Sequence, residues 1–306
     1  MKATIRKPFL LKMWENYPKL WKFLIDVGIL LKYKTLKAEK LPKKVVLPSS
    51  TILYVNSEEN RGRALLISNG MTQKRMTHFW SQAVHVMNPD LIIDVGVNYG
   101  ECIFSAIYPS HTMIYGVEAN RQLFKYIEQS KNVHPNKAQI LLFNTFAADK
   151  DDEEKVFFVD KHWSGTSSAS YRPSHQMVEP VAVHSTTIDS LVQGIAMNKA
   201  VLFKVDVEGY EAFVLKGMTT IFETSAAMLG FIEFNSEYIE KSGIAVNDFL
   251  TFLNRYFTLY IYKADDSLVK ANNLQFEDLK ELFNSDYIHT DMILASDEGI
   301  IELLGM

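Results

Sequence analysis

Short apolar runs alternate with helical patterns along most of the chain. The apolar and often β-branched runs predict buried strands, and segments with apolar residues every three or four positions predict amphipathic helices. Strands are expected over 91–95, 113–117, 139–143, 201–207, 228–234, 259–263 and 291–295, with further extended segments over 155–159 and 181–187. Helices are expected over 77–87, 103–107, 211–216 and 248–256, and near 123–127 and 276–283. This alternation predicts an α/β fold with a doubly wound, mostly parallel sheet.

The first 74 residues follow a different pattern. Residues 1–45 have helical spacing that is broken at a proline and ends in a lysine-rich linker. Residues 51–56 and 63–68 are β-type runs separated by a polar, glycine-containing loop, which predicts a β-hairpin. We therefore predict an N-terminal helical and β-hairpin extension with a basic linker over 1–74, followed by a main domain over 75–306.

Charge is distributed unevenly along the 306 residues. Residues 1–44 carry twelve Lys and Arg against three Asp and Glu, a net charge of +9, and the rest of the chain carries −13. Nucleic-acid binding needs a basic surface, so the acidic main domain argues against a nucleic acid as the main partner. The N-terminal lysines are interleaved with tryptophan, phenylalanine and leucine, which leaves two interpretations open. Either a helix packs on the domain with a solvated basic face, or residues 1–44 make peripheral contact with a membrane.

No segment predicts a membrane-spanning helix or a cleaved signal peptide. Charged residues interrupt the N-terminal apolar runs well before the roughly 18 uncharged residues that a spanning helix needs. The one cysteine, Cys102, excludes an internal disulfide and a multi-cysteine metal site, and its apolar neighbours predict a buried side chain. We therefore expect a cytoplasmic protein, at the inner face of the membrane if residues 1–44 touch lipid. A homo-oligomer is compatible with the sequence.

The segment 91–100 joins a predicted strand to a glycine-containing turn. Asp94, Gly96, Asn98 and Gly100 lie at the strand end and in the turn, where open α/β sheets bind nucleotides. A dinucleotide site would carry three glycines in the pattern G-x-G-x-x-G, and a carboxylate at the strand end would repel phosphate. The same carboxylate could hold an ammonium group, directly or through backbone and water. The pattern favours S-adenosylmethionine, which has an amino-acid end and no phosphate, and a plain strand-to-helix turn is the alternative.

Two further turns are expected at the same edge of the sheet. Glu118 ends the second strand, 24 positions after Asp94, and an acid at this distance bonds ribose hydroxyls in doubly wound sheets. Thr145 and Phe146 follow the third strand, beside the place that an adenine would occupy. Glu118 fits either ribose binding or an ordinary surface turn, and Phe146 fits either ring contact or core packing.

Charged residues alternate at the end of the strand predicted over 201–207. Lys204, Asp206 and Glu208 are two positions apart and would share one face of the strand. Burying three charges without partners is costly, and these lie where ligands bind in such sheets. The alternation indicates a functional site, with a structural ion-pair network as the alternative.

Several motifs together resemble the FkbM-family methyltransferases in order and spacing. The resemblance rests on residues 94–100 (DVGVNYG), 116–118 (GVE), 187–191 (TIDSL), 203–211 (FKVDVEGYE), 214–217 (VLKG) and 231–234 (FIEF). It covers about residues 75–296, and the K-x-D-x-E-G-x-E piece is its most specific part. The family usually has alanine at the position of Val97, and proline after the second-strand acid where this chain has Ala119 and Asn120.

The resemblance implies a fold, a cofactor and a reaction. The fold is the class I, Rossmann-like fold of S-adenosylmethionine-dependent methyltransferases. The reaction is O-methyl transfer, often to sugars of glycans or to polyketide hydroxyls. The residues expected to line the cofactor are Asp94, Gly96, Asn98, Gly100, Glu118, Ala119, Thr145, Phe146 and Asp206. Asp206 and Glu208 would lie near the reacting end.

A hydroxyl group is a weak nucleophile, so a general base within hydrogen-bond reach is expected. The candidate catalytic residues are Asp206, Glu208, Lys204, His162 and Glu233. His162 belongs to the insertion 161–166, which predicts either a lid with Trp163 on a sugar face or a loop with a solvent-exposed histidine. The carboxylates of the set are also hard oxygen ligands, but we expect no metal.

These features predict an S-adenosylmethionine-dependent O-methyltransferase. The acceptor expected first is a hydroxyl of a sugar in a cell-surface or lipid-linked glycan. Two alternatives stay open: a small natural product as the acceptor, and a non-catalytic cofactor-binding scaffold. The intact set of Lys204, Asp206, Glu208 and Glu211 argues against the scaffold, because a protein without catalysis has no need to keep those charges.

Overall fold

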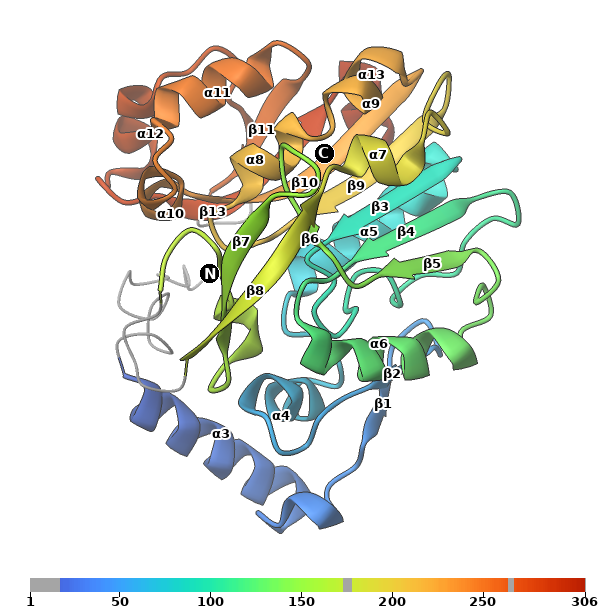
Figure 1. Cartoon of the computed structure of the whole chain (residues 1–306), viewed down its shortest axis with the longest axis vertical. Coiled ribbons are helices and arrows are strands. Elements are labelled where there is room, and N and C mark those ends of the chain that lie inside the picture. Colours follow the sequence, from blue (N-terminus) through green and yellow to red (C-terminus); the bar gives the residue numbers. More distant parts are fainter. Residues whose placement is uncertain (1–16, 173–177, 264–266, 306) are drawn as a thin grey trace.

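An eight-stranded sheet forms the centre of the computed structural model, which describes residues 17–172, 178–263 and 267–305 (Figure 1). The strand order is β12-β11-β13-β10-β9-β3-β4-β5. The strands run over Leu91–Val95 (β3), Met113–Val117 (β4), Ile140–Phe143 (β5), Ala200–Val205 (β9), Ala227–Asn235 (β10), Thr258–Tyr262 (β11), Leu268–Lys270 (β12) and His289–Ala295 (β13). Neighbours from β5 to β10 pair in parallel, and β13 is antiparallel to both β10 and β11. The predicted doubly wound, mostly parallel α/β sheet is confirmed.

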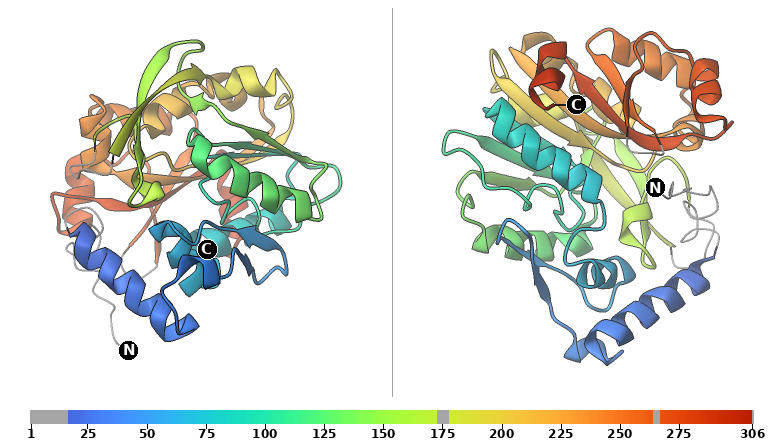
Figure 2. Two further views of the ribbon diagram at one scale, coloured as in Figure 1. Left: turned by 60° about the horizontal axis from the view of Figure 1, so that its bottom comes forward. Right: turned by 180° about the vertical axis from the view of Figure 1, so that it is seen from behind.

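Helices cover both faces of this sheet. Leu91, Ile93 and Val95 of β3 pack into the core on one face, and Ile92 packs into the core on the other. The first core includes side chains of α7 (Ile188–Val192), α8 (Glu211–Lys216), α9 (Thr219–Thr224), α10 (Ser236–Lys241), α11 (Val246–Asn254) and α12 (Phe276–Phe283). The second includes α5 (Lys74–Met87), α6 (Arg121–Val133) and α13 (Glu298–Leu303), and α5 crosses the rear face in cyan (Figure 2). Apart from Asp94 in β3 and Lys204 in β9, these two central strands are apolar because both faces of the sheet are buried.

A second, smaller sheet is formed by β6 (Phe146–Ala147), β7 (Glu154–Asp160) and β8 (Val178–Thr186). β7 and β8 form a long antiparallel ladder, and β6 pairs with β8 in parallel. The predictions of extended segments over 155–159 and 181–187 are confirmed. A 3-10 turn, η2 (Ser164–Thr166), follows β7 and contacts α4 (Asn60–Ile67), so this sheet reaches the N-terminal part of the chain.

The N-terminal extension contains a helix and a hairpin, as predicted, but the hairpin is placed differently. Its elements are α3 (Pro18–Tyr33), η1 (Ala38–Lys40), β1 (Lys44–Val46), β2 (Ile52–Tyr54) and α4. β2 pairs with β1, and the run predicted as a strand over 63–68 lies largely in α4. The Glu59 carboxylate caps this helix by accepting hydrogen bonds from the backbone N–H of Arg61 and Gly62, and the helix buries Leu65 and Leu66. The helical pieces predicted before residue 17 lie outside the described residues.

The helix predicted over 103–107 is wrong. After the glycine turn, Phe104 N–H donates to the Gly100 carbonyl in the helical manner, but Ser105 N–H then donates to the Cys102 carbonyl, three residues back. Tyr108 N–H donates to the Asn136 side chain at 3.0 Å. The segment is therefore a series of turns, because its donors find partners outside a helical ladder. Cys102 is buried, as predicted.

The extension and the main domain share one core. Side chains of α3, α4 and β2 belong to the same buried cluster as Ile92 of β3 and Leu202 of β9. Tyr54 N–H also donates to the Ser130 hydroxyl of α6 at 2.8 Å. The predicted division after residue 74 therefore separates two stretches of sequence that pack as neighbours. Among the described helices, none combines the length and the apolar composition that crossing a membrane would require.

Gly62 gives a test of how closely α4 packs. A Cβ at this position would lie 2.1 Å from the Asn56 carbonyl oxygen, so the backbone must move to admit one. We expect Gly62→Ala to lower the free energy of unfolding by about 1–3 kcal/mol, measured by urea denaturation. The matched control is Gly299→Ala in the first turn of α13, where the nearest atom is a flexible side-chain oxygen at 3.3 Å. Equal stability of the two variants would contradict the close approach.

Candidate active site

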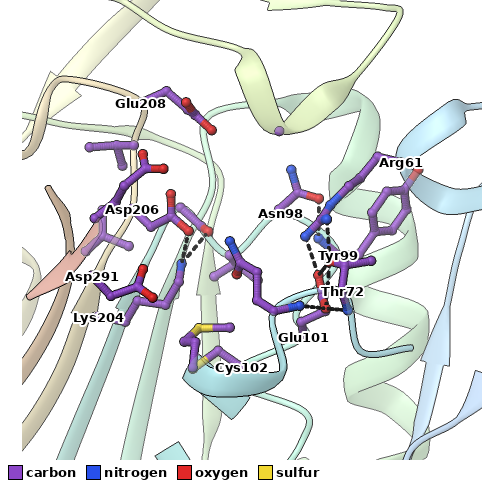
Figure 3. A pocket seen from close by; sticks show the side chains of 18 of the residues that line it. Arg61, Thr72, Asn98, Tyr99, Glu101, Cys102, Lys204, Asp206, Glu208 and Asp291 are labelled. Carbon is purple, nitrogen blue, oxygen red and sulfur yellow. Dashed lines mark hydrogen bonds and ion pairs between the residues drawn. The ribbon is translucent and has the colours of Figure 1, made fainter. Parts of the chain in front are cut away.

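A cavity of about 1250 Å³ opens at the carboxyl ends of β3, β4, β9 and β10 (Figure 3). Ten of the predicted site residues line it: Gly96, Asn98, Glu118, Ala119, Thr145, Phe146, Lys204, Asp206, Glu208 and Glu233. Asp94, Gly100 and His162 are outside the lining. The parallel topology brings the others together because these strand ends meet at one edge of the sheet.

The turn after β3 is shaped by its first glycine. Gly96 has φ +80°, and a Cβ there would lie 1.9 Å from the carbonyl oxygen of Asp206. Only glycine therefore allows the end of β3 to approach the end of β9 this closely. Gly100 has φ +90° and closes the turn by donating its N–H to the Val97 carbonyl.

Glu118 is held in place by the backbone of two turns. One carboxylate oxygen accepts the N–H of Asn98, and the other accepts the N–H of Asn120, both at 2.7 Å. Burial raises the pKa of Glu118, and these two donors oppose the rise by stabilising the carboxylate. The side chain is 8% exposed and faces the cavity, so its orientation is fixed before any ligand arrives.

Lys204 connects the two turns from below the cavity. Its ammonium group lies 3.3 Å from the Asp94 carboxylate, 3.6 Å from that of Asp206 and 3.0 Å from the Gly96 carbonyl oxygen. Burial alone would lower the pKa of Lys204, but the two carboxylates raise it, so the lysine stays charged. The ammonium group beside Asp94 is therefore the Lys204 side chain of the protein itself. Asp94 does not line the cavity, and it acts on the cavity by holding Lys204, which does.

Four carboxylates gather at the opposite end of the cavity from Asn98 and Arg61 (Figure 3). Oxygens of Asp206, Glu208 and Glu233 lie within 4.8 Å of one another, and Asp291 is nearby. Glu208 is not on the strand, as the two-residue spacing predicted, because β9 ends at Val205 and Glu208 has φ +55° in the following turn.

The turn that carries Glu208 is held by a buried acid. The Glu211 carboxylate accepts the N–H of Val207 at 2.9 Å and that of Gly209 at 3.2 Å. Burial, with a contribution from the charge of Glu233, raises the pKa of Glu211 to about 8. The acid ending the K-x-D-x-E-G-x-E motif therefore shapes the turn from beneath and does not line the cavity.

The antiparallel strand β13 contributes residues that the sequence did not predict. His289 and Asp291 line the cavity because β13 pairs in register with β10, with Asp291 opposite Glu233. His289 Nε2 lies 2.7 Å from a Glu233 oxygen, and Arg75 of α5 pairs with Asp291 at 3.1 Å. The sequence signal that could have revealed them is the spacing of His289 and Asp291, two positions apart at the start of an apolar strand.

Sequence comparison identifies the family. The pattern of the methyltransferase FkbM domain matches residues 94–263, which is more than half of the chain. The chain belongs to the FkbM methyltransferase family. The sequence prediction of this family is therefore confirmed, and the match includes the glycine turn, Glu118 and the turn after β9. Among curated proteins, no match is found.

Solved structures similar to this methyltransferase are distant from it in sequence. The FkbM methyltransferase of Methylobacillus flagellatus is 11% identical, with a TM-score of 0.40 over 77% of this chain and 54% of that one. An O-methyltransferase of Bacillus cereus, solved with SAH, is 7% identical, with a TM-score of 0.39 over 74% and 82%. The O-methyltransferase TomG of Streptomyces achromogenes, solved with SAM, is 8% identical, with a TM-score of 0.39 over 74% and 82%.

The sequence left open whether Phe146, in the turn after β5, packs in the core or faces a ligand, and the structure shows that it lies in the core and lines the cavity. Phe146 is 4% exposed, with its ring 5.0 Å from that of Tyr210, and it belongs to the main core. It also lines the cavity of the methyltransferase, as does Thr145, whose hydroxyl bonds that of Thr186 at 2.9 Å. Phe146 therefore contributes to the core and to the apolar wall of the cavity.

Most of the insertion 161–166 is buried. Asp160 accepts the N–H groups of His162 and Trp163, and Asn60 donates to the His162 carbonyl at 3.1 Å. His162 is 5% exposed, so the alternative of a solvent-exposed histidine is wrong. Trp163 lines the cavity, with the Arg61 guanidinium 5.5 Å from its ring, whereas His162 lies outside the lining.

The three nearest carboxylates could in principle bridge a divalent cation, since they are hard ligands at suitable spacing. Two of their charges, however, have partners within the methyltransferase. Asp206 lies beside Lys204, and Glu233 is hydrogen-bonded to His289. The expectation of a metal-independent site stays a prediction.

The buried pair of Lys204 and Asp94 gives a test of the site's framework. We expect Lys204→Met to lower the free energy of unfolding by about 3–5 kcal/mol, because it leaves the Asp94 carboxylate buried and unpaired. The double variant Asp94→Asn/Lys204→Met is expected to regain part of this loss. Chemical denaturation of the wild type, both single variants and the double variant measures the coupling, and simple additivity would contradict it.

Proposed function

We propose that this methyltransferase transfers a methyl group from S-adenosylmethionine to a hydroxyl group of a saccharide. One observation carries the proposal: a single cavity contains the glycine turn with Glu118 and, at its other end, a carboxylate cluster with a histidine. The first set suits a ligand that has a ribose and a charged amino-acid end. The second suits the removal of a proton from an acceptor.

The residues present fit S-adenosylmethionine. Each Glu118 oxygen accepts one backbone hydrogen bond, so each retains capacity for another, as two vicinal ribose hydroxyls require. The Asn98 side chain and the turn at Gly96 would hold the amino-acid end, and Phe146 offers an apolar wall for the adenine. When bound, the cofactor supplies an electrophilic methyl group on a positively charged sulfur. Carboxylates such as Asp206 would favour that positive charge.

We propose His289 as the general base. Its Nε2–H donates to Glu233, and Nδ1 has no hydrogen-bond partner among the described residues, so Nδ1 is the nitrogen that would take the proton. Burial alone would lower the pKa of His289, but the Glu233 carboxylate raises it, which makes the neutral imidazole a stronger base. Asp206 is a weaker choice because its carboxylate already pairs with the Lys204 ammonium, 3.6 Å away. Glu233 is then the positioning residue.

The remaining space suits a saccharide acceptor. The cavity exceeds the roughly 300–1,000 Å³ that a single small ligand occupies, which leaves room for an acceptor beside the cofactor. Trp163 and Tyr262 line this space with aromatic surface, and Thr72 and Gln73 line it with hydrogen-bonding groups. Sugars combine apolar faces with hydroxyl edges, so this lining supports the choice. The proposed location is the cytoplasm.

Cofactor binding is tested by calorimetry. We expect the protein to bind S-adenosylmethionine and its demethylated product but not NAD. Glu118→Gln is expected to weaken binding about 10- to 100-fold, because an amide nitrogen cannot accept the ribose hydroxyls. The matched control is Glu128→Gln at an exposed position of α6 outside the cavity. A folded wild type that binds no S-adenosylmethionine would refute the proposed function.

Proton transfer is tested by the pH dependence of methyl transfer. Because the neutral imidazole is the active form, activity is lost as pH falls through the raised pKa of His289. We expect the acidic limb of kcat to lie above the usual histidine pKa of about 6.5, and Glu233→Gln to move it to lower pH. His85→Gln, at an exposed position of α5, is the control.

Burial raises the pKa of Asp291 to about 6, and the Glu233 charge contributes to that rise, so the comparison is repeated in an Asp291→Asn background, where Asp291 no longer titrates. Identical profiles for the wild type and Glu233→Gln would remove His289 from the role of base.

Activity that survives exhaustive treatment with EDTA is expected as well, and its loss would show that the carboxylate cluster needs a metal.

A further inference from the structure

Helix α3 has two apolar faces, and the described residues cover only one of them. Ile25 and Ile29 are buried against the rest of the extension. On the other side lies a stripe of exposed apolar side chains, here called the outer stripe: Leu20, Phe23, Leu24, Val27, Leu30 and Leu31, between 37% and 68% exposed. Their spacing of three and four residues places them along one side of the helix. A contiguous apolar surface of this kind marks an interaction site.

The outer stripe cannot turn inward, because the opposite face is anchored to α4. Asp26 forms an ion pair with Arg63 at 2.5 Å, and the Lys32 ammonium donates to the Leu66 carbonyl at 2.7 Å. The Tyr33 hydroxyl donates to the same carbonyl at 3.1 Å. These contacts run along the helix and fix its rotation about its own axis. The contacts therefore hold the stripe on the outward side of α3, and the helix itself lies at the edge of the molecule (Figures 1 and 2).

Positive charge surrounds the outer stripe. Residues 17–44 contain eight lysines against two acids, whereas the chain after residue 44 is acidic. Lys19 and Lys22 lie within the helix, and Lys34 and Lys37 follow its end, all exposed. An apolar stripe bordered by lysines is the pattern of a helix that lies in the interface of an anionic membrane.

We propose that α3 docks lengthwise on the surface of an anionic lipid bilayer, with the outer stripe inserted among the acyl chains and the lysines at the headgroups. At 16 residues the helix is about 24 Å long, shorter than the hydrocarbon core of about 30 Å, so it lies along the surface. A second copy of the chain is a poorer partner, because a two-fold contact through the stripe would bring two lysine-rich segments together.

Docking in this way would orient the cavity. Trp21 and Ile25 of the same helix line the cavity, as Arg61 does, so the bilayer would lie beside one wall of the site. This consequence rests on the proposed function: it favours an acceptor sugar carried on a lipid. Membrane binding itself needs neither cofactor nor activity, so the two proposals are tested separately.

The test is flotation of the full chain with vesicles of phosphatidylcholine alone or of an equimolar mixture with phosphatidylglycerol. We expect binding to the anionic vesicles, weakened by salt, and about tenfold or more loss of binding in Phe23→Ser/Leu31→Ser. The matched control is Ile107→Ser/Leu303→Ser, which removes apolar side chains of similar exposure, 51% and 72%, elsewhere on the surface. Circular dichroism and thermal unfolding check that every variant is folded.

Three results would overturn the proposal. The first is a wild type that does not bind anionic vesicles. The second is an equal loss of binding in the two double variants. The third is a dimer, detected by light scattering, that is lost in the outer-stripe variant and kept in the control variant. The last result would identify a second copy as the partner of the stripe.

Discussion

The ion pair between Lys204 and Asp94 is the contact on which the site depends. The two residues lie opposite each other in the ladder between β9 and β3, and both side chains are almost completely buried. Neither charge would be tolerated there alone, since burying an unpaired ion costs several kcal/mol. Together with the close approach at Gly96, the pair fixes the distance between the turn after β3 and the turn after β9. Those turns carry the two halves of the cavity.

Basic side chains from other elements lie beside the carboxylates of the cluster. Lys204 comes from β9, Arg75 from α5 and His289 from β13, and each lies beside one carboxylate of the cluster. The pairs differ in what they offer a proton acceptor. Asp206 pairs with an ammonium group, whereas the Glu233 carboxylate raises the pKa of His289. Proximity in the fold thereby divides roles among residues that look alike in sequence.

The N-terminal extension is an integral part of the core and of the site. It shares a core with the sheet, and Glu59 links it to the insertion after β7 by accepting the N–H of Ser164. Thr72 and Arg61 both bond Glu101, directly after the glycine turn. The extension therefore both lines part of the cavity and carries the outer stripe. If the stripe meets a bilayer, methyl transfer and membrane contact are joined through a single rigid unit.

The sequence by itself determined the central sheet, the family and ten residues of the cavity lining, because strand ends in a parallel sheet necessarily converge and the glycine turn is a local signal. Periodicity alone did not show that β2 pairs with β1. The apolar run 63–68 is short enough to suit a strand or a helix, and the cap at Glu59 that marks it as a helix is seen only in the structure. The roles of Lys204 as partner of Asp94 and of His289 beside Glu233 also needed the tertiary structure. These pairs join residues 110 and 56 positions apart, and only strand order and register bring them into contact.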